Sequence, residues 1–127
     1  MEIDYSRIKL DLYSKNLTKL PDDITKYINL IELNCSNNKI TSLDNLPPGL
    51  QKLYCQDNAI TRLDNLPLGL QTLDCNYNKI TRLDNLPPGL QILNCGGNAI
   101  VRLDNLPPGL QKLDCTSNNI TLSLIHI

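Results

Sequence analysis

A unit of twenty residues recurs along the sequence, and this period constrains the fold more than any other feature. Asparagine and cysteine both return at that interval. The asparagines are Asn38, Asn58, Asn78, Asn98 and Asn118, and the cysteines are Cys35, Cys55, Cys75, Cys95 and Cys115. A fixed period of this length is typical of a solenoid, in which each repeat packs only on its neighbours. Positions that every repeat keeps therefore serve the fold, and what is particular to this protein lies where the repeats differ.

Each repeat contains one short segment with alternating apolar and polar residues. Leu53 and Cys55 alternate with Lys52, Tyr54 and Gln56, which indicates a strand with one buried face. Equivalent strands are expected to pair in parallel along the stack. The asparagine that follows each strand is expected to satisfy backbone N–H and C=O groups at the bend.

The repeat matches a known pattern. The conserved positions of one unit are Leu50, Leu53, Cys55, Asn58 and Ile60, which fit LxxLxLxxN/CxL with cysteine replacing the third leucine. The same frame fits from Leu30, Leu70, Leu90 and Leu110. The chain thus resembles the leucine-rich-repeat family over nearly its whole length. The resemblance implies an α/β-type repeat solenoid, mostly β with extended returns, coiled right-handed with a parallel sheet on its concave face.

The segments that return from one strand to the next are short and rich in proline. The run Pro47-Pro48-Gly49 and its equivalents exclude a regular helix there, so the convex side is expected to be extended. Proline followed by glycine suits the central positions of a type II turn. Leu68 replaces the second proline in one unit. Returns of the LPPGL type resemble those of bacterial effector proteins and of proteins encoded by large viruses of amoebae.

The chain is predicted to form one leucine-rich-repeat domain over residues 1–127, with regular repeats over 30–120. Residues 1–29 read as a degenerate repeat that caps the stack. A short amphipathic helix is expected at about 21–28, because Ile24, Tyr27 and Ile28 follow i, i+3, i+4 spacing.

Residues 121–127 break the period and form an irregular tail. Three interpretations remain open for them: a longer array that has been cut short, a short strand that caps the end, or an uncapped edge through which the protein self-associates.

The cysteines are expected to be buried thiols. Their number is odd and they occupy one repeat position, so their Cβ vectors run parallel, which is poor disulfide geometry. Zinc needs ligands that converge on a tetrahedron, and a straight column does not converge. Free thiols favour a reducing intracellular compartment, cytoplasmic, and the host cytoplasm if the protein is an effector.

Composition excludes several kinds of partner. The net charge is −1 and the charges are mixed, so no basic stripe for nucleic acid exists. No apolar stretch approaches the roughly 18 residues of a membrane span, and the first residues lack a signal-peptide layout.

No catalytic constellation is recognisable, and no metal or cofactor site is predicted. The only histidine is His126, and the buried cysteines lack a base. A repeated column of acids, Asp44, Asp64, Asp84 and Asp104, stands two residues after Arg62, Arg82 and Arg102 in the units that have arginine. A functional site is rarely copied identically, so this column is interpreted as a solvated convex edge of ion pairs, and the chain is predicted not to be an enzyme.

The variable positions beside the strand residues are the candidate site, because they are expected to face outward from the sheet. The candidate partner-binding residues are Lys52, Tyr54, Asp57, Asp74, Tyr77, Ile92, Asn94, Lys112 and Asp114. Tyr54, Tyr77 and Ile92 are the larger apolar members and lie on adjacent coils. Tyrosine is enriched in binding hot spots, although it also has a high propensity for β-strands that has no bearing on binding.

The most favoured function is protein–protein recognition by a rigid concave face, with an unidentified protein as partner. Two alternatives remain: the substrate-recognition part of a larger effector such as a ubiquitin ligase, and a self-associating structural array.

Overall fold

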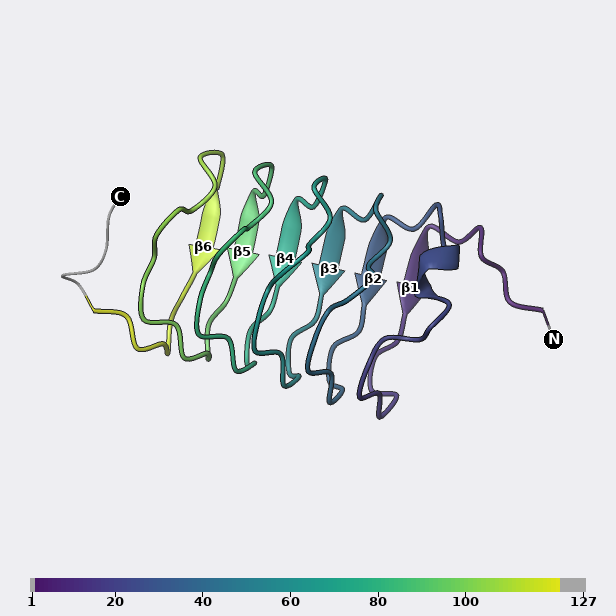
Figure 1. The fold of residues 1–127 in the computed structure, drawn as a ribbon, viewed down its shortest axis with the longest axis horizontal. Helices are drawn as coiled ribbons and strands as arrows, with labels where there is room; N and C mark the ends of the chain where they lie inside the picture. The colour runs from purple at the N-terminus through teal and green to yellow at the C-terminus, as the bar shows by residue number, and fades with distance from the viewer. Residues whose placement is uncertain (1, 122–127) are drawn as a thin grey trace.

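The computed structural model describes residues 2–121 as a stack of coils, each contributing one short strand (Figure 1). The strands are β1 Lys9–Asp11, β2 Glu32–Asn34, β3 Lys52–Tyr54, β4 Thr72–Asp74, β5 Ile92–Asn94 and β6 Lys112–Asp114. They form one parallel sheet in sequence order, β1-β2-β3-β4-β5-β6. Within residues 2–121 the helical structure is a single 3-10 turn, η1 Ile24–Lys26, and these residues contain no helix long and apolar enough to cross a membrane.

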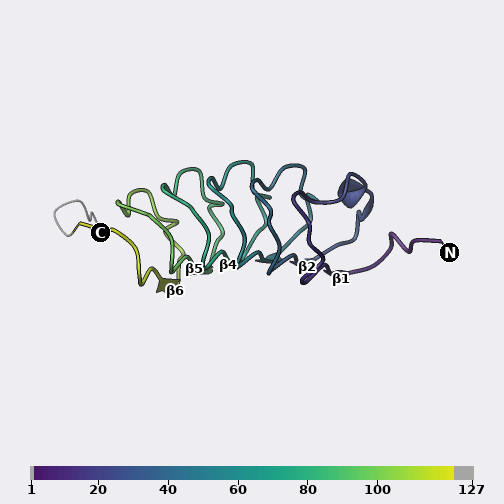
Figure 2. The same ribbon diagram turned by 90° about the horizontal axis from the view of Figure 1, so that it is seen from below.

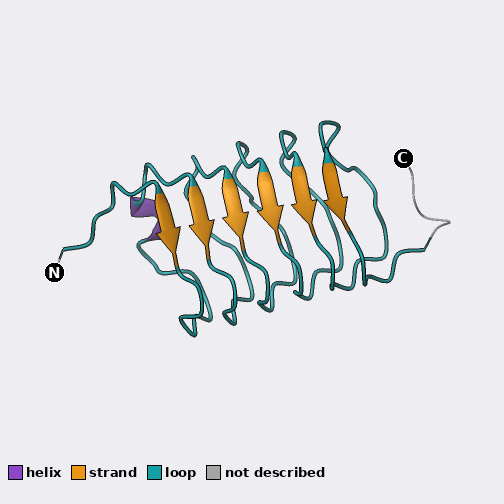
Figure 3. Ribbon diagram, turned by 180° about the vertical axis from the view of Figure 1, so that it is seen from behind, coloured by secondary structure: helices purple, strands orange, loops and turns teal. Residues whose placement is uncertain are grey.

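The register of the sheet follows directly from the period. Leu33 pairs with Leu53, and Leu53 pairs with Leu73, so equivalent positions of successive repeats lie side by side. The first step is longer, because Leu10 pairs with Leu33. All the strands point the same way (Figure 3), and the stack bends gently with the strands on its inner side (Figure 2). The predicted solenoid with a parallel sheet on the concave face is confirmed.

The interior is built from columns of identical side chains. Leu33, Leu53, Leu73 and Leu93 are fully buried, as are Cys35, Cys55, Cys75 and Cys95. The cysteines are free thiols, and desolvation by burial raises the pKa of Cys35 and of Cys95 to about 12. The prediction of a buried thiol column is confirmed for these four, which stay protonated and pack as small apolar groups.

The asparagine column closes the bend after each strand. Asn78 donates from Nδ2 to the carbonyl oxygens of Cys55 at 3.1 Å and Cys75 at 3.0 Å, and its Oδ1 accepts from the N–H of Ile60 at 3.0 Å. The equivalent asparagines repeat this pattern. Each amide therefore bonds backbone groups of its own coil and of the coil before it, as the sequence predicted.

The returns are extended, but the turn within them differs from the prediction. The N–H of Leu50 donates to the carbonyl of Pro47 at 3.2 Å, so the chain does turn at Pro48-Gly49. Gly49 does not have the positive φ that a type II turn requires. The prediction of a type II turn is therefore wrong. A left-handed residue occurs four positions earlier instead, at Asn45 with φ 62°.

Residues 2–29 close the N-terminal end of the core. The Tyr5 ring meets the Tyr27 ring edge-on at 4.9 Å, and the Tyr5 hydroxyl donates to Asp23 at 2.6 Å. Ile24 and Tyr27 are buried. The helix expected at about 21–28 is only the turn Ile24–Lys26, because the backbone leaves helical geometry at Tyr27, φ −79° and ψ 72°, to bring Leu30 into the core column.

The last described coil is less well covered than the others. Leu113 of β6 is 37% exposed, whereas its equivalents in β2 to β5 are at 0%. The interpretations of the tail and His126 concern residues 122–127, which lie outside the described residues.

Candidate partner-binding face

The candidate residues all belong to the strands or to the turns that follow them on the sheet side. Four of them are exposed: Lys52, Asp57, Tyr77 and Lys112. The others are half-buried: Tyr54, Asp74, Ile92, Asn94 and Asp114. They form one face of the stack, which consists of the first and third residues of each strand and the left-handed residue of the next turn. We call this the concave face below.

The three larger apolar residues lie on adjacent coils without forming one continuous patch. Tyr54 pairs with Asp74, so a carboxylate is its neighbour on the next strand. Ile92 lies between Thr72 and Lys112 at the other end of the short strands. The register thus divides the concave face into a row at the first strand position and a row at the third.

A backbone feature that periodicity does not reveal organises the turn after each strand. Asn37, Asp57, Tyr77 and Ser117 all have φ near 56°, and Gly97 has φ 67°. This left-handed conformation is costly for most residues and easiest for glycine and asparagine. Asparagine and glycine at this repeat position, Asn37 and Gly97, indicate a left-handed residue in the sequence. Tyr77 at the same position does not favour that conformation, so the pattern is not evident from the sequence.

Tyr77 lies against a glycine that the column provides. A Cβ atom at Gly97 would be 2.5 Å from Cδ1 and 2.8 Å from Cε1 of Tyr77, so the ring covers the bare backbone of Gly97. The side chain is still 64% exposed. The turn therefore holds an aromatic ring against the protein on one side and presents it to solvent on the other.

Two of the candidate carboxylates also support the turns that follow them. Asp74 Oδ1 accepts from the N–H of Asn76 at 3.1 Å, and Asp114 Oδ1 accepts from the N–H and the hydroxyl of Thr116 at 3.1 and 2.8 Å. Asn34 makes the same bond to the N–H of Ser36. An amide thus fills this structural role as well as a carboxylate does.

The same two carboxylates have opposite pKa shifts. Desolvation by burial raises the pKa of Asp74, the hydrogen bond from Asn76 opposes this, and the charges of Asp57 and Asp114 raise it further. The hydrogen bonds from Thr116 lower the pKa of Asp114. The negative charges of Asp57 and Asp114 therefore disfavour ionisation of the half-buried Asp74.

Polar side chains also link adjacent coils on this face. Asn76 Oδ1 accepts from the N–H of Gly96 at 2.7 Å, which links the turn after β4 to the turn after β5. Gln56 Oε1 is buried and has no hydrogen-bond partner among the described residues. The alternation in the sequence predicts Gln56 as an outward-facing residue and does not predict that its Oε1 is buried.

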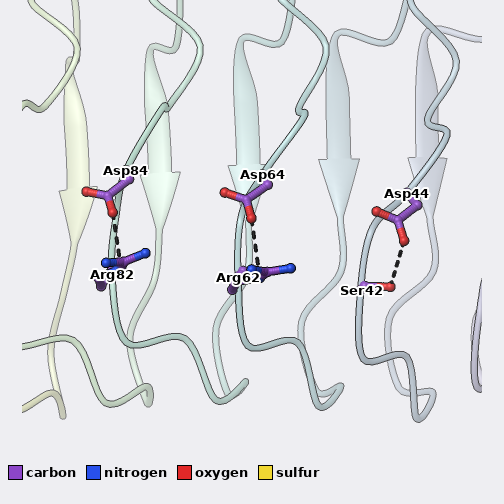
Figure 4. Close-up of polar contacts among 6 residues, drawn as sticks. All are labelled: Ser42, Asp44, Arg62, Asp64, Arg82 and Asp84. Atoms are coloured by element: carbon purple, nitrogen blue, oxygen red, sulfur yellow. Dashed lines mark hydrogen bonds and ion pairs between the residues drawn. The ribbon is translucent and has the colours of Figure 1, made fainter.

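The repeated arginines and aspartates lie on the return segments, away from the strands (Figure 4). Arg62 pairs with Asp64 at 3.3 Å and Arg82 with Asp84 at 3.1 Å, with exposed side chains. Ser42 takes the arginine position in an earlier coil and its hydroxyl donates to Asp44 at 3.1 Å. The interpretation of this column as a solvated edge of ion pairs is confirmed.

Across residues 2–121, no group of three His, Cys, Asp or Glu side chains is placed to hold a metal ion. What the concave face offers is a rigid sheet with an exposed aromatic ring, carboxylates and lysines.

Comparison with known families agrees with this architecture. The model of the Leucine Rich Repeat matches residues 29–53, and the model of Leucine Rich repeats (2 copies) matches residues 48–88. A search of the curated proteins returned no match. The chain is a leucine-rich-repeat protein.

Solved structures of bacterial leucine-rich-repeat proteins share the fold. A Shigella effector LRR domain is 36% identical with a TM-score of 0.85, and the alignment covers 91% of this chain and 52% of that one. InlJ from Listeria monocytogenes, whose functional domain includes a cysteine ladder, is 37% identical with a TM-score of 0.66 over 94% of this chain and 33% of that one. YopM from Yersinia enterocolitica, at 23% identity and a TM-score of 0.61 over 100% of this chain and 41% of that one, shows the fold alone. The chain thus spans about half the Shigella domain.

Proposed function

We propose that the protein is a non-enzymatic interaction module whose concave face binds a protein partner. The observation that carries this proposal is the contrast between the invariant buried columns and the variable concave face. The repeats keep their buried columns and differ most at these solvent-facing positions, which is the pattern expected of a stack that presents a surface. Leucine-rich-repeat folds commonly serve as protein–protein interaction modules, and the fold by itself names no partner.

The structure suggests a test that leaves the frame intact, because other repeats supply tolerated residues at each position. Tyr54→Asn copies Asn34, Tyr77→Asn copies Asn37, and Ile92→Thr copies Thr72. The triple variant should lose at least tenfold in affinity for a protein captured by the parent, since hot-spot residues carry roughly 2 kcal/mol or more. Its melting temperature should be little changed.

A matched control lies on the return edge. Arg62→Ser and Arg82→Ser copy Ser42, which bonds the equivalent aspartate. This double variant should bind the captured protein as the parent does. Unchanged binding by the concave variant, or loss of binding by the return-edge variant, would overturn the assignment of the face.

A larger effector, for example a ubiquitin ligase in which this domain recognises the substrate, is a second candidate. Its support is the likeness to the Shigella effector LRR domain, about half of which the chain spans. Sequencing the gene on both sides of the segment encoding residues 1–127 tests it. A catalytic domain in the same reading frame would support this candidate, and in-frame stop codons without one would contradict it.

End-to-end self-association is a third candidate, favoured by the exposure of Leu113 on the outer strand β6. Sedimentation at increasing concentration tests it, with Leu113→Lys as the comparison variant. A monomer at all concentrations would contradict this candidate.

We also propose an intracellular reducing compartment, including the host cytoplasm for an effector, since the thiol column consists of free cysteines. Fractionation of cells that express the protein, with detection of the reduced thiols, tests this assignment.

A further inference from the structure

The middle of the concave face has an uneven distribution of charge. Its segments 72–77 and 92–97 contain no lysine or arginine, whereas Asp74 lies on β4 and Asp57 lies on the turn of the preceding coil. Lys52 and Lys112 occupy the first strand position, in the row away from these turns. The row nearest the turns is therefore anionic.

Tyr77 lies in the turn that follows this anionic row, at the same turn position as Asp57. The N–H of Asp57 donates to the carbonyl of Asn76, and the N–H of Tyr77 donates to the carbonyl of Gly96, so Asp57, Tyr77 and Gly97 occupy adjacent coils. The Tyr77 ring leans over Gly97, and the side chain remains 64% exposed. An exposed aromatic ring next to carboxylates attracts a cation through its quadrupole and through their charge.

The contact between Tyr77 and Gly97 makes this arrangement specific to one coil. Gly97 is the one glycine among the described residues with a positive φ, and any side chain there would displace the ring. The ring is thus held in place before a partner arrives, which lowers the entropy that binding must overcome.

We propose that the Tyr77 ring, with Asp57 at the same turn position of the preceding coil and Asp74 on the strand before it, receives an arginine side chain from a basic segment of the protein partner. This inference rests on the proposed function and adds the chemistry of the partner. Arginine fits better than lysine, because its planar guanidinium can stack on the ring while its N–H groups bond the carboxylates. Nucleic acid is a poor occupant of this anionic row, because its phosphates would be repelled.

The test uses the full chain and a defined probe. Acetyl-Gly-Gly-Arg-Gly-Gly-amide is titrated into ¹⁵N-labelled protein and followed by NMR. Saturable shifts are expected at the amides of Asp57, Asp74, Tyr77 and Gly97. The same peptide with citrulline, the neutral isostere of arginine, should cause none of these shifts, and a lysine peptide should bind more weakly.

Variants identify the groups responsible. Tyr77→Asn should weaken binding of the arginine peptide by about two- to fivefold, the range for an exposed cation–π contact, and Asp57→Asn should weaken it as well. Both variants copy Asn37, which has the same backbone conformation. Asp64→Asn, on the return edge, makes the same change of charge and should leave binding unchanged.

Equal shifts with citrulline or lysine, shifts centred elsewhere, or no shifts at all would overturn the arginine proposal. These outcomes leave the proposed function standing if the triple concave variant still loses its captured protein. If that variant keeps its captured protein, the proposed function fails instead. The two failures are therefore distinguishable.

Discussion

Asn78 shows how much of the fold depends on one amide per coil. Its Nδ2 and Oδ1 bond backbone groups on two successive coils, and the side chain is buried. No water can replace those bonds without entering the core, so the cost of losing them falls on the folded state.

Replacing Asn78 by alanine should therefore lower the free energy of unfolding by on the order of 3 kcal/mol, at roughly 1–3 kcal/mol for each buried group left unsatisfied. Urea denaturation followed by circular dichroism measures this. The exposed Asn119→Ala is the control and should change stability by less than about 0.5 kcal/mol. Equal effects of the two variants would contradict the role of the column.

The thiol column leads to a second prediction at the residue scale. Four cysteines are fully buried, whereas Cys115 is partly exposed. Burial raises the pKa of Cys35 to about 12, so the reactive thiolate is scarce below that pH. A disulfide reagent added to native protein near pH 8 should modify Cys115 first, and the others only after denaturant is added. Rapid reaction of all five thiols in the native protein would contradict the burial.

The sequence predicted these buried residues well, because side-chain period and burial are linked through the strand. It did not predict which face residues are exposed. Tyr54 is half-buried beside Asp74 while Tyr77 projects, and this difference depends on backbone angles that alternation does not encode.

At the scale of the element, the left-handed turn after each strand positions the residues of the candidate site. Glycine and asparagine accept that conformation readily, and tyrosine accepts it at some cost. Gly97 also provides the surface on which Tyr77 rests.

Gly97→Ala should destabilise the protein by about 1–3 kcal/mol, since alanine would be strained at φ 67° and would displace the tyrosine ring. Gly69→Ala is a matched control, because Gly69 lacks a positive φ and no atom lies within 4 Å of the added Cβ. Thermal melting compares the two variants. Similar losses at both positions would contradict the special status of Gly97.

The raised pKa of Asp74 leads to a prediction about how stability depends on pH. Burial and the charges of Asp57 and Asp114 raise the pKa of Asp74 in the folded protein. Ionisation of Asp74 therefore opposes folding, and the free energy of unfolding falls as the pH rises through the range in which the carboxyl group ionises. Asp74→Asn should therefore raise the melting temperature at pH 7, and the gain should disappear at a pH below 3.8, the ordinary pKa of an aspartate side chain. Asn34 shows that an amide keeps the turn bond. A loss of stability at pH 7 would contradict this account.

The elements show where sequence reasoning reached its limit. The strands and extended returns were predictable because they repeat. The helix expected at about 21–28 belongs to a segment that does not repeat, and it is shortened to Ile24–Lys26. The spacing of Ile24 and Tyr27 predicts a helical turn but does not specify where the chain must bend toward the core. The prediction of a type II turn was wrong for a similar reason. Proline and glycine indicate that the chain turns, but several types of turn accept them.

At the scale of the whole molecule, stability should depend on position along the stack. Each coil packs only on its neighbours, and an interior coil has two. The period predicted that the repeats stack, because one repeat cannot bury its own apolar face.

Leu73→Ala, in an interior coil, should cost about 2–5 kcal/mol, as expected for a leucine in a tightly packed core. Leu113→Ala, in the last strand, should cost clearly less, since that side chain is already 37% exposed. Denaturation curves of the two variants provide the comparison. Equal costs would mean that the stack is more uniformly cooperative than its contacts indicate.

The asparagine bonds also have a direction, and it bears on how the chain is made. The N–H of Ile40 donates to Asn58 Oδ1, and the N–H of Ile60 donates to Asn78 Oδ1. The acceptor for each of these N–H groups therefore comes from the coil that is synthesised next. During translation, the most recently made coil still lacks this hydrogen bond, whereas the coils before it already have it. We therefore expect the coils to fold in order from the N-terminal side during synthesis, because each of these isoleucine N–H groups gains its acceptor only when the next coil has been made.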